Sequence, residues 1–302
     1  MSDLYETLRP LVFSIAYRML GSASDAEDIV QEAFLRLHRE SVKGTEILSP
    51  QAYLSAITTR LSIDHLRSAR VRRERYTGTW LPEPLLTDEG SDAVEHADTA
   101  ETADSLSMAF LVLLESLTPV ERAVFLLREV FDYGYDQIAA VVGKSEDNCR
   151  QIAVRARRQI DAKRPRFEAS RKRRDELARR FFDAVSTQDA AELADLLAAD
   201  VVAYADGGGK AVAFPRPVHG RERVARVLLG PAAQGGRLAV SGMRIVAING
   251  QPGALFLDPE GRPVVAVMLD IADGVVQTLR AISNPEKLRH LGTFADPQEP
   301  AS

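Results

Sequence analysis

The stretch from Thr118 to Ile160 constrains the fold of this chain more than any other, because it has the pattern of a helix-turn-helix. It opens with Thr-Pro-Val-Glu, which combines an N-capping threonine, a proline at the first helical position and a glutamate at capping-box spacing. A second, short apolar helix is expected to end at Gly143, a residue suited to a left-handed C-cap. Ser145 should cap the third helix. Three helices in this order, with a Gly turn between the last two, are typical of DNA-binding domains.

The third helix of this stretch separates apolar from polar residues at helical spacing. The side chains expected to face the core are Cys149, Ile152, Ala153, Ala156 and Ile160, and those expected to meet DNA are Asn148, Arg150, Gln151, Arg155 and Arg158. Asn, Gln and Arg bond base edges bidentately, and Arg also pairs with phosphates. The alternative is a helical hairpin whose basic face is simply solvated. We interpret the stripe as a DNA-binding surface.

Composition limits the remaining possibilities. The 302 residues suffice for two or three domains, and no apolar run approaches the ~18 residues that span a bilayer. With no N-terminal signal pattern either, we expect a cytoplasmic protein without membrane contact. The single cysteine, Cys149, excludes an internal disulfide framework and a multi-cysteine zinc site. It is expected to pack as a small apolar residue, with a redox sensor as the alternative.

The formal net charge of -5 is unusual for a protein that grips DNA alone, because phosphate contacts supply nearly all non-specific affinity. Either a partner protein supplies part of the affinity for DNA, or an acidic part of the chain weakens DNA binding by the basic part.

Residues 1–75 look all-helical and contain two charged surfaces. The segment Asp25–Arg39 places apolar residues on one face and acidic and amide residues on the other, a face that would ordinarily just be solvated. The next helix opens at Ser49-Pro50 and turns Leu54, Ile57 and Leu61 inward. Near its end, five arginines fall in nine residues from Arg67 onward, more than a helix terminus needs.

Residues 76–104 read as an acidic linker. The segment Trp80-Leu81-Pro82-Glu83-Pro84 cannot form regular helix, and the linker holds eight acidic residues and no lysine or arginine. Its Trp80 is the only tryptophan of the chain, and a Trp between prolines usually staples a linker to a neighbouring surface.

A second domain begins near Ser170, as an α+β fold. Helices are expected at 175–186 and 190–198, followed by a curved antiparallel sheet. The predicted strands are 201–205, 211–214, 238–248, 253–257, 263–271 and 274–283. If this domain were an enzyme, its acid-base candidates would be Asp206, His219 and Asp270. Asp206-Gly207-Gly208-Gly209-Lys210 is not a P-loop, because Ala211 replaces the residue that would hold magnesium. Two roles remain possible for this segment: a glycine-rich turn after a strand, or a contact between domains.

The order of these elements resembles a group IV (extracytoplasmic-function) RNA polymerase sigma factor. The segment Asp25–Leu37 looks like that family's core-polymerase-binding helix in sigma-2, and Leu61–Arg67 is similar to the part that opens and reads the minus-10 element. Thr118–Ile160 is similar to sigma-4, which reads the minus-35 element. Many members have Arg-Asn where this chain has Thr59-Arg60, so base preference does not transfer.

Three further motifs resemble one subgroup, the sigma-J type, which fuses a SnoaL-like, NTF2-like domain to sigma-4. They are Trp80–Pro84, Asp206–Lys210 and Asn284-Pro285-Glu286-Lys287-Leu288. The resemblance implies that the fused domain regulates in place of a separate anti-sigma factor. We therefore expect Trp80–Pro84 to dock near the other two motifs and to hold sigma-2 and sigma-4 compact in the free protein.

The resemblance also implies roles for individual residues. Core polymerase, through its β′ clamp coiled coil, would be bound by Asp25, Asp28, Gln31 and Glu32, and the β flap is a further partner. The minus-10 DNA would be bound by Arg60, Asp64, Arg67, Arg70, Arg72 and Arg73. Regulation would involve Trp80, Leu81, Pro82, Glu83, Pro84, Asp206, Gly207, Gly208, Gly209, Lys210, Asn284, Pro285 and Lys287.

The expected domains are sigma-2 (1–75), the linker (76–104), sigma-4 (105–167), the NTF2-like cone-shaped barrel (170–292) and a tail (293–302). We expect no catalytic site, metal or cofactor, while a small ligand of the NTF2-like pocket is left open. The remaining alternative is a helix-turn-helix regulator with a ligand-sensing or enzymatic C-terminal domain. It would bind specific DNA without polymerase.

Overall fold

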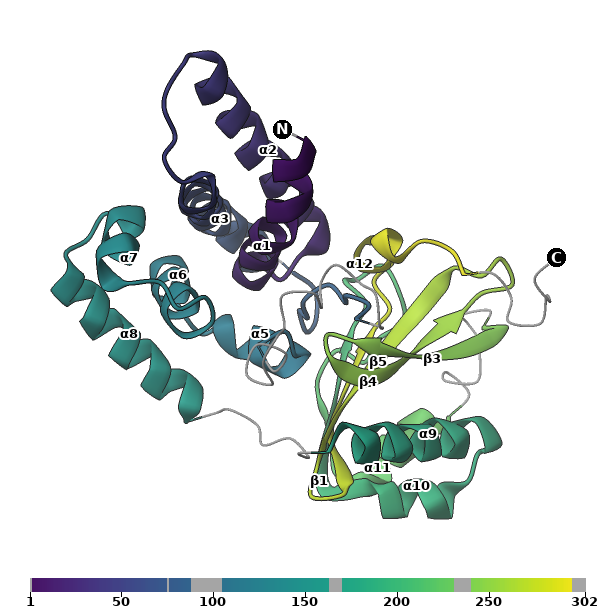
Figure 1. The fold of residues 1–302 in the computed structure, drawn as a ribbon. Helices are drawn as coiled ribbons and strands as arrows, with labels where there is room; N and C mark the ends of the chain where they lie inside the picture. Colours follow the sequence, from purple (N-terminus) through teal and green to yellow (C-terminus); the bar gives the residue numbers. More distant parts are fainter. Residues whose placement is uncertain (1, 75, 88–104, 163–169, 231–239, 295–302) are drawn as a thin grey trace. The chain divides into compact units, whose positions relative to one another are not determined.

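The computed structural model describes residues 2–74, 76–87, 105–162, 170–230 and 240–294 (Figure 1). The chain forms two compact units. One comprises residues 1–75 and 89–164, and the other comprises residues 76–88 and 165–302. Residues 76–88, which the sequence assigns to a linker, therefore belong to the same unit as the C-terminal domain.

Three helices make the first part of the first unit: α1 (Ser2–Leu20), α2 (Ala23–Val42) and α3 (Pro50–Glu74). The N-cap of α2 is Ser22, whose hydroxyl accepts from the Asp25 amide. The predicted apolar face of α2 is confirmed, since Val30, Ala33, Phe34 and Leu37 form a core with Val12 and Leu54.

The prediction for α3 was right for Leu54 and only partly right for Ile57 and Leu61, which are half-buried. The buried side of this helix instead carries small polar residues such as Thr59, whose hydroxyl donates to the Ser55 carbonyl. An apolarity pattern misses such a face, because a threonine that bonds its own helix backbone can be buried at little cost.

The other described helices of this unit are α5 (Met108–Leu114), α6 (Pro119–Glu129), α7 (Tyr135–Val142) and α8 (Glu146–Asp161). Every predicted cap is present. Thr118 and Glu121 form a capping box on α6, Gly143 ends α7 with φ +68°, and the Ser145 hydroxyl caps α8. The inner residues predicted for α8 are buried and pack against α6 and α7.

The second unit is a mixed six-stranded sheet with helices on one face (Figure 1). Its elements are α9 (Arg171–Thr187), α10 (Ala190–Leu196), β1 (Leu197–Asp206), β2 (Val218–His219), α11 (Arg221–Leu228), β3 (Gly242–Ile248), β4 (Gln251–Leu257), β5 (Pro263–Ala272), β6 (Val275–Ile282), α12 (Pro285–Leu288) and the 3-10 turn η1 (Arg289–Leu291). The strand order is β2-β1-β6-β5-β4-β3. Its core is formed by α9, α10 and α11 against the sheet, with Phe181 and Phe182 at the centre.

Three details of this unit correct the sequence-based prediction. Strand β1 pairs parallel with β6, so the sheet is not purely antiparallel. The predicted strand 211–214 is irregular, because it follows the tight turn of three glycines and precedes Pro215 and Pro217, which lack amide donors. Helix α11 and the short strand β2 were not predicted.

Candidate nucleic-acid interface and linker-binding site

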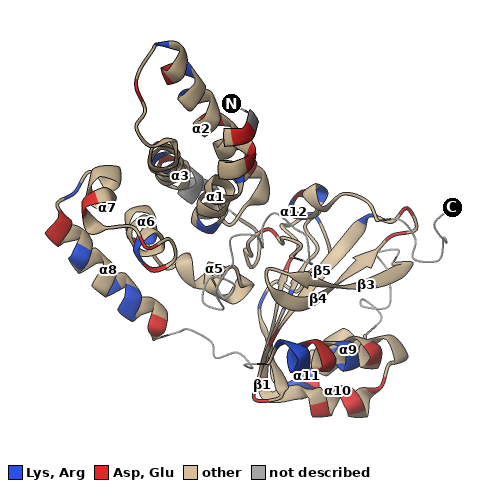
Figure 2. Ribbon diagram, in the orientation of Figure 1, with Lys and Arg blue, Asp and Glu red and all other residues tan. Residues whose placement is uncertain are grey.

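Helix α8 presents its predicted polar stripe to solvent. Asn148, Gln151, Arg155 and Arg158 are all exposed, on the side opposite buried Cys149 and Ile152. Figure 2 shows basic residues along the length of this helix. Arg150 is also exposed, but it is held by Glu146 at 2.9 Å and lies over the Tyr135 ring at 4.8 Å from the centroid. Of the five residues predicted to meet DNA, Arg150 is therefore engaged by neighbouring side chains of the chain itself.

The acidic face of α2 is less uniformly exposed than its sequence suggests. Asp28 and Gln31 are exposed, whereas Asp25 and Glu32 are half-buried. Asp25 lies 3.3 Å from His65 of α3, and Glu32 accepts a 2.7 Å hydrogen bond from Arg36, which lowers the pKa of that carboxyl. Exposed Leu35 shares this side of α2 and adds an apolar contact surface that a charge-based prediction does not include.

The residues predicted to meet minus-10 DNA fall into three groups. Arg60 donates to the Ala140 carbonyl at 2.7 Å and to the Val141 carbonyl at 3.0 Å, at the C-terminal end of α7. Asp64 and Arg67 form an exposed pair at 3.1 Å. The side chains of Arg70, Arg72 and Arg73 lie outside the described residues. Arg60 therefore binds the helix-turn-helix in this arrangement, because a guanidinium satisfies unpaired carbonyls at a helix end.

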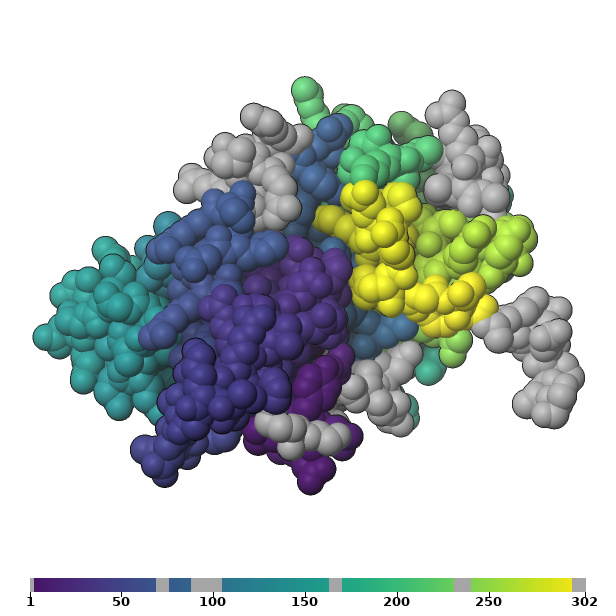
Figure 3. Space-filling model, turned by 90° about the horizontal axis from the view of Figure 1, so that it is seen from above, coloured from purple at the N-terminus to yellow at the C-terminus, as the bar shows by residue number. Residues whose placement is uncertain are grey.

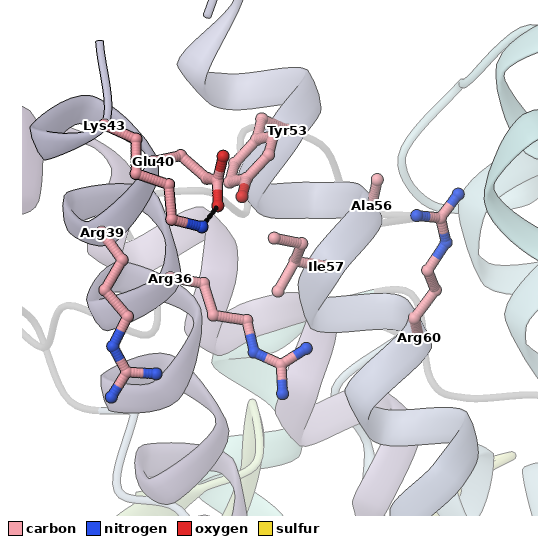
Figure 4. A pocket seen from close by; sticks show the side chains of 8 residues that line it. All are labelled: Arg36, Arg39, Glu40, Lys43, Tyr53, Ala56, Ile57 and Arg60. Carbon is pink, nitrogen blue, oxygen red and sulfur yellow. Dashed lines mark hydrogen bonds and ion pairs between the residues drawn. The ribbon is translucent and has the colours of Figure 1, made fainter. Parts of the chain in front are cut away.

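A cationic groove between α2 and α3 was not predicted. It has a volume of about 460 Å³. Its lining includes Arg36 and Arg39 of α2, the C-cap residue Lys43, and Tyr53, Ile57 and Arg60 of α3. Figure 4 shows Arg60 pointing away from the other three cations, and Glu40 paired with Lys43 at 2.7 Å. The signal was present in the sequence, because residues spaced by three and four share one helical face.

The segment Trp80–Pro84 contacts the turns that carry the other two motifs, Asp206–Lys210 and Asn284–Leu288. The predicted docking contact is therefore confirmed. Asp206, fully buried at the end of β1, accepts from the Leu81 amide at 2.8 Å and from Lys287 Nζ at 2.7 Å. Lys287 also donates to the Leu81 carbonyl, and Tyr76 donates to Asp206 at 2.5 Å. Burial and the neighbouring carboxylate raise the pKa of Tyr76, so its hydroxyl remains a donor.

Aromatic rings enclose the lysine of this cluster. Lys287 Nζ lies 4.4 Å from the centroid of the Trp80 ring and 4.9 Å from that of Tyr76. A desolvated cation gains from such ring faces, which explains why a tryptophan stands in an otherwise polar segment. The turn that carries Lys287, α12 with η1, lies at the surface of this unit (Figure 3).

Beyond Glu83, the linker segment runs along the turn between β3 and β4. Leu85 exchanges two hydrogen bonds with Asn249, at 3.0 and 2.8 Å, and the Thr87 amide donates to the Ala247 carbonyl at 2.9 Å. The Pro84 carbonyl lies 2.7 Å from His290 Nε2. Since β3 is an edge strand, pairing of this kind also covers backbone groups that would otherwise stay free.

The glycines after Asp206 allow this close approach. Gly208 has φ +59° and Gly209 has φ +70°, and a Cβ on Gly208 would overlap the Asn284 amide and approach the Tyr76 hydroxyl to 2.9 Å. The motif thus serves both as a left-handed turn and as a contact surface. Lys210 instead pairs with Glu286 at the surface.

The three acid-base candidates of the C-terminal domain lie apart. Asp206 holds the linker segment, His219 is exposed on β2, and Asp270 pairs with Arg280 and accepts from Gln251 at 2.7 Å. Among the described residues, none of the three lines the large cavity of this domain, and no group of three or more potential ligands could hold a metal ion. No described helix has the length and apolarity needed to cross a bilayer.

The thiol of the single cysteine is predicted to react slowly in the folded chain. Cys149 is fully buried on the inner face of α8, and burial raises the pKa of its thiol. Because the thiolate is the nucleophile, we expect the native chain to react with Ellman's reagent at least tenfold more slowly than the chain in denaturant. Equal rates in both states would favour a redox-active thiol.

Comparison with known proteins agrees with this geometry. Residues 4–72 match the model of Sigma-70 region 2, and residues 107–160 match that of Sigma-70, region 4. The chain is 36% identical over 290 residues to ECF RNA polymerase sigma factor SigJ of Mycobacterium tuberculosis, covering 94% of this chain and 91% of that protein. It is 32% identical to the probable ECF RNA polymerase sigma factor SigI of the same species, covering 95% and 94%.

The fold comparison extends over the C-terminal domain. The crystal structure of M. tuberculosis SigJ superimposes with a TM-score of 0.75 at 32% identity, covering 96% of this chain and 98% of that one. Two sigma-70 regions and a fused α+β domain are therefore shared along nearly the whole length. The chain belongs to the extracytoplasmic-function RNA polymerase sigma factors.

Proposed function

We propose that this sigma factor uses three surfaces in turn: the α2 face around Asp28 for core polymerase, the α8 stripe for the upstream promoter element, and α3 for the downstream element. The observation that carries the assignment is the exposed stripe of α8, which is set on a fully capped helix-turn-helix. The match to Sigma-70 region 2 disfavours a plain repressor, since a repressor needs no such domain.

We further propose that melted DNA passes through the cationic groove between α2 and α3. Arg36, Arg39 and Lys43 would follow the phosphates of a single strand, and Tyr53 offers a ring on which a base can stack. Asp64 and Arg67 of α3 were predicted to bind the downstream element, and the groove would add DNA contacts from α2. Such binding requires charge and stacking, with no chemical step.

Contacts inside the first unit support a resting arrangement in which α3 is occupied by the helix-turn-helix. Arg60 binds the end of α7, the Tyr133 hydroxyl donates to Ser55 at 2.7 Å, and Arg122 donates to the Met19 carbonyl at 2.7 Å. Simultaneous reading of two separated promoter elements would need these contacts to open. Binding to core polymerase can supply the free energy, which agrees with a chain too acidic to grip DNA alone.

We infer that the fused domain regulates this opening in place of a separate anti-sigma factor. The support is the linker-binding site, in which Asp206 accepts from the Leu81 amide and Lys287 lies against the Trp80 ring. Asn284 donates to the Tyr76 hydroxyl, which in turn donates to Asp206. The segment that follows sigma-2 is bound by the C-terminal domain, so a change at this site would reach the linker.

The test is transcription in vitro with core polymerase, on a promoter selected from a randomised DNA library by the holoenzyme. Replacing Arg36, Arg39 and Lys43 by Ala should reduce open-complex formation by roughly tenfold or more, because single-strand binding depends on phosphate contacts. On a template carrying a premelted bubble, the same variant should lose less activity.

The control removes three exposed cations from α9, with Ala at Arg171, Lys172 and Arg179, and should leave transcription unchanged. A groove variant that opens promoters like the parent chain would refute the groove assignment. Tight, specific binding to DNA without core polymerase would instead favour the repressor.

A further inference from the structure

The C-terminal domain contains an apolar cavity of about 510 Å³ whose role the sigma activity does not explain. It lies between the sheet, the end of α11 and the irregular segment 212–214. Its described lining is almost entirely apolar and includes Ala205, Ala213, Arg226, Phe256, Ala281 and Ser283. This volume falls in the range of small-molecule sites.

The described helices pack against one end of the sheet face, and the other end borders the cavity. At the end covered by the helices, the side chains of Leu269, Ile271 and Val276 are each at most 1% exposed. At the end that borders the cavity, Phe256, Val265 and Ala281 remain partly accessible although they lie on interior strands of the sheet. Among the described residues no side chain covers this apolar surface, and a hollow of this kind on interior strands is typical of a binding site.

Small residues on neighbouring strands make the floor of the cavity. Ala205 pairs with Ala281 across β1 and β6, and Ala281 pairs with Val267 across β6 and β5. Larger side chains at these positions would fill the space and complete the core, as they do a few residues further along each strand. The sequence therefore specifies a hollow here.

Two polar groups give the cavity a chemical preference. Ser283 donates to the Val212 carbonyl at 2.9 Å and keeps only acceptor capacity. Arg226, in the last turn of α11, is exposed and forms no ion pair with the described residues, and it is the charged residue of the described lining. Carboxylates that could act as a catalytic base are absent from that lining, so the arrangement suits binding.

We propose that this cavity is a receptor site for an amphiphilic organic anion. An apolar body occupies the space above Ala205 and Ala281, and a single anionic group pairs with Arg226 at the rim. This site is separate from the surfaces for polymerase and DNA, so its test does not depend on transcription.

The test uses the full chain and two fluorescent probes of matched shape. One is 1-anilinonaphthalene-8-sulfonate, an anion, and the other is N-phenyl-1-naphthylamine, its uncharged counterpart. We expect saturable binding of one probe molecule per chain. Ala281→Phe and, independently, Ala213→Trp should weaken binding of both probes by roughly tenfold or more, because each fills the cavity.

The charge is tested separately. Arg226→Gln should weaken the anionic probe by about two- to fivefold, as for an exposed ion pair, and leave the neutral probe unchanged. Arg223→Gln, on the same helix but outside the lining, should alter neither.

Two results would overturn the proposal. If both cavity-filling variants fold cooperatively and bind the probes like the parent chain, the probes bind elsewhere and the site is wrong. If Arg226→Gln affects both probes equally or neither, the anionic class is wrong.

Discussion

Lys287→Met should lower the free energy of unfolding of the C-terminal domain by roughly 3–5 kcal/mol, because it leaves the buried Asp206 carboxylate without its cation. Methionine keeps an unbranched side chain, one heavy atom shorter, and removes the charge and the donors of the ammonium group. Denaturant unfolding followed by the fluorescence of Trp80, the only tryptophan of the chain, reports on this site directly.

Two comparisons make this result specific. Lys210→Met removes a half-exposed pair with Glu286 and should cost less than about 1 kcal/mol. The double variant Asp206→Asn with Lys287→Met should recover most of the lost stability, since a neutral pair leaves no buried charge uncompensated. A single variant as stable as the parent chain would show that the cluster does not hold the linker.

The second large effect is expected on α8. Arg155→Ala or Gln151→Ala should each weaken holoenzyme binding to the selected promoter by about 1–3 kcal/mol, because a bidentate contact to a base edge is lost. Binding to DNA with a scrambled upstream element should change little. The ratio of the two affinities, measured by competition at fixed salt, separates base reading from general attraction to phosphates.

Arg157→Ala is the control for this helix. Arg157 is tied to Glu129 of α6, so its removal should leave the affinity ratio unchanged. If Arg155→Ala and Arg157→Ala lowered both affinities equally, α8 would contribute charge without reading sequence.

The sequence was most informative where structure is set locally. The caps at Thr118, Gly143 and Ser145 are short-range signals, and each appears where predicted. The linker contact was predictable only through the resemblance between motifs, because Leu81 and Asp206 are 125 positions apart. No local pattern links residues at such a separation.

Other features depend on tertiary packing that the sequence does not display. The parallel pairing of β1 with β6 depends on where the chain returns after α11 and three strands. The bonds from Arg60 to the carbonyls of α7 require two domains to meet, and a base-reading arginine and a helix-binding arginine look alike in sequence. The cationic groove depends on the approach of α2 to α3, which the spacing of charges along either helix alone does not specify.

Strand β1 of the C-terminal domain borders two different features, the apolar cavity and the bound linker segment. Successive residues of a strand face opposite ways, so Ala205 borders the cavity while Asp206 holds the linker. A slip of β1 by one position would place the Asp206 carboxylate in the apolar cavity and leave Lys287 without this partner. The ion pair therefore fixes the register of β1, whose pairing with β6 is irregular near its start. Ser283 and Asn284, whose amides both bind the Asp206 carbonyl, join the two sides across a single peptide bond. A molecule that shifts the floor of the cavity therefore moves the anchor of the linker.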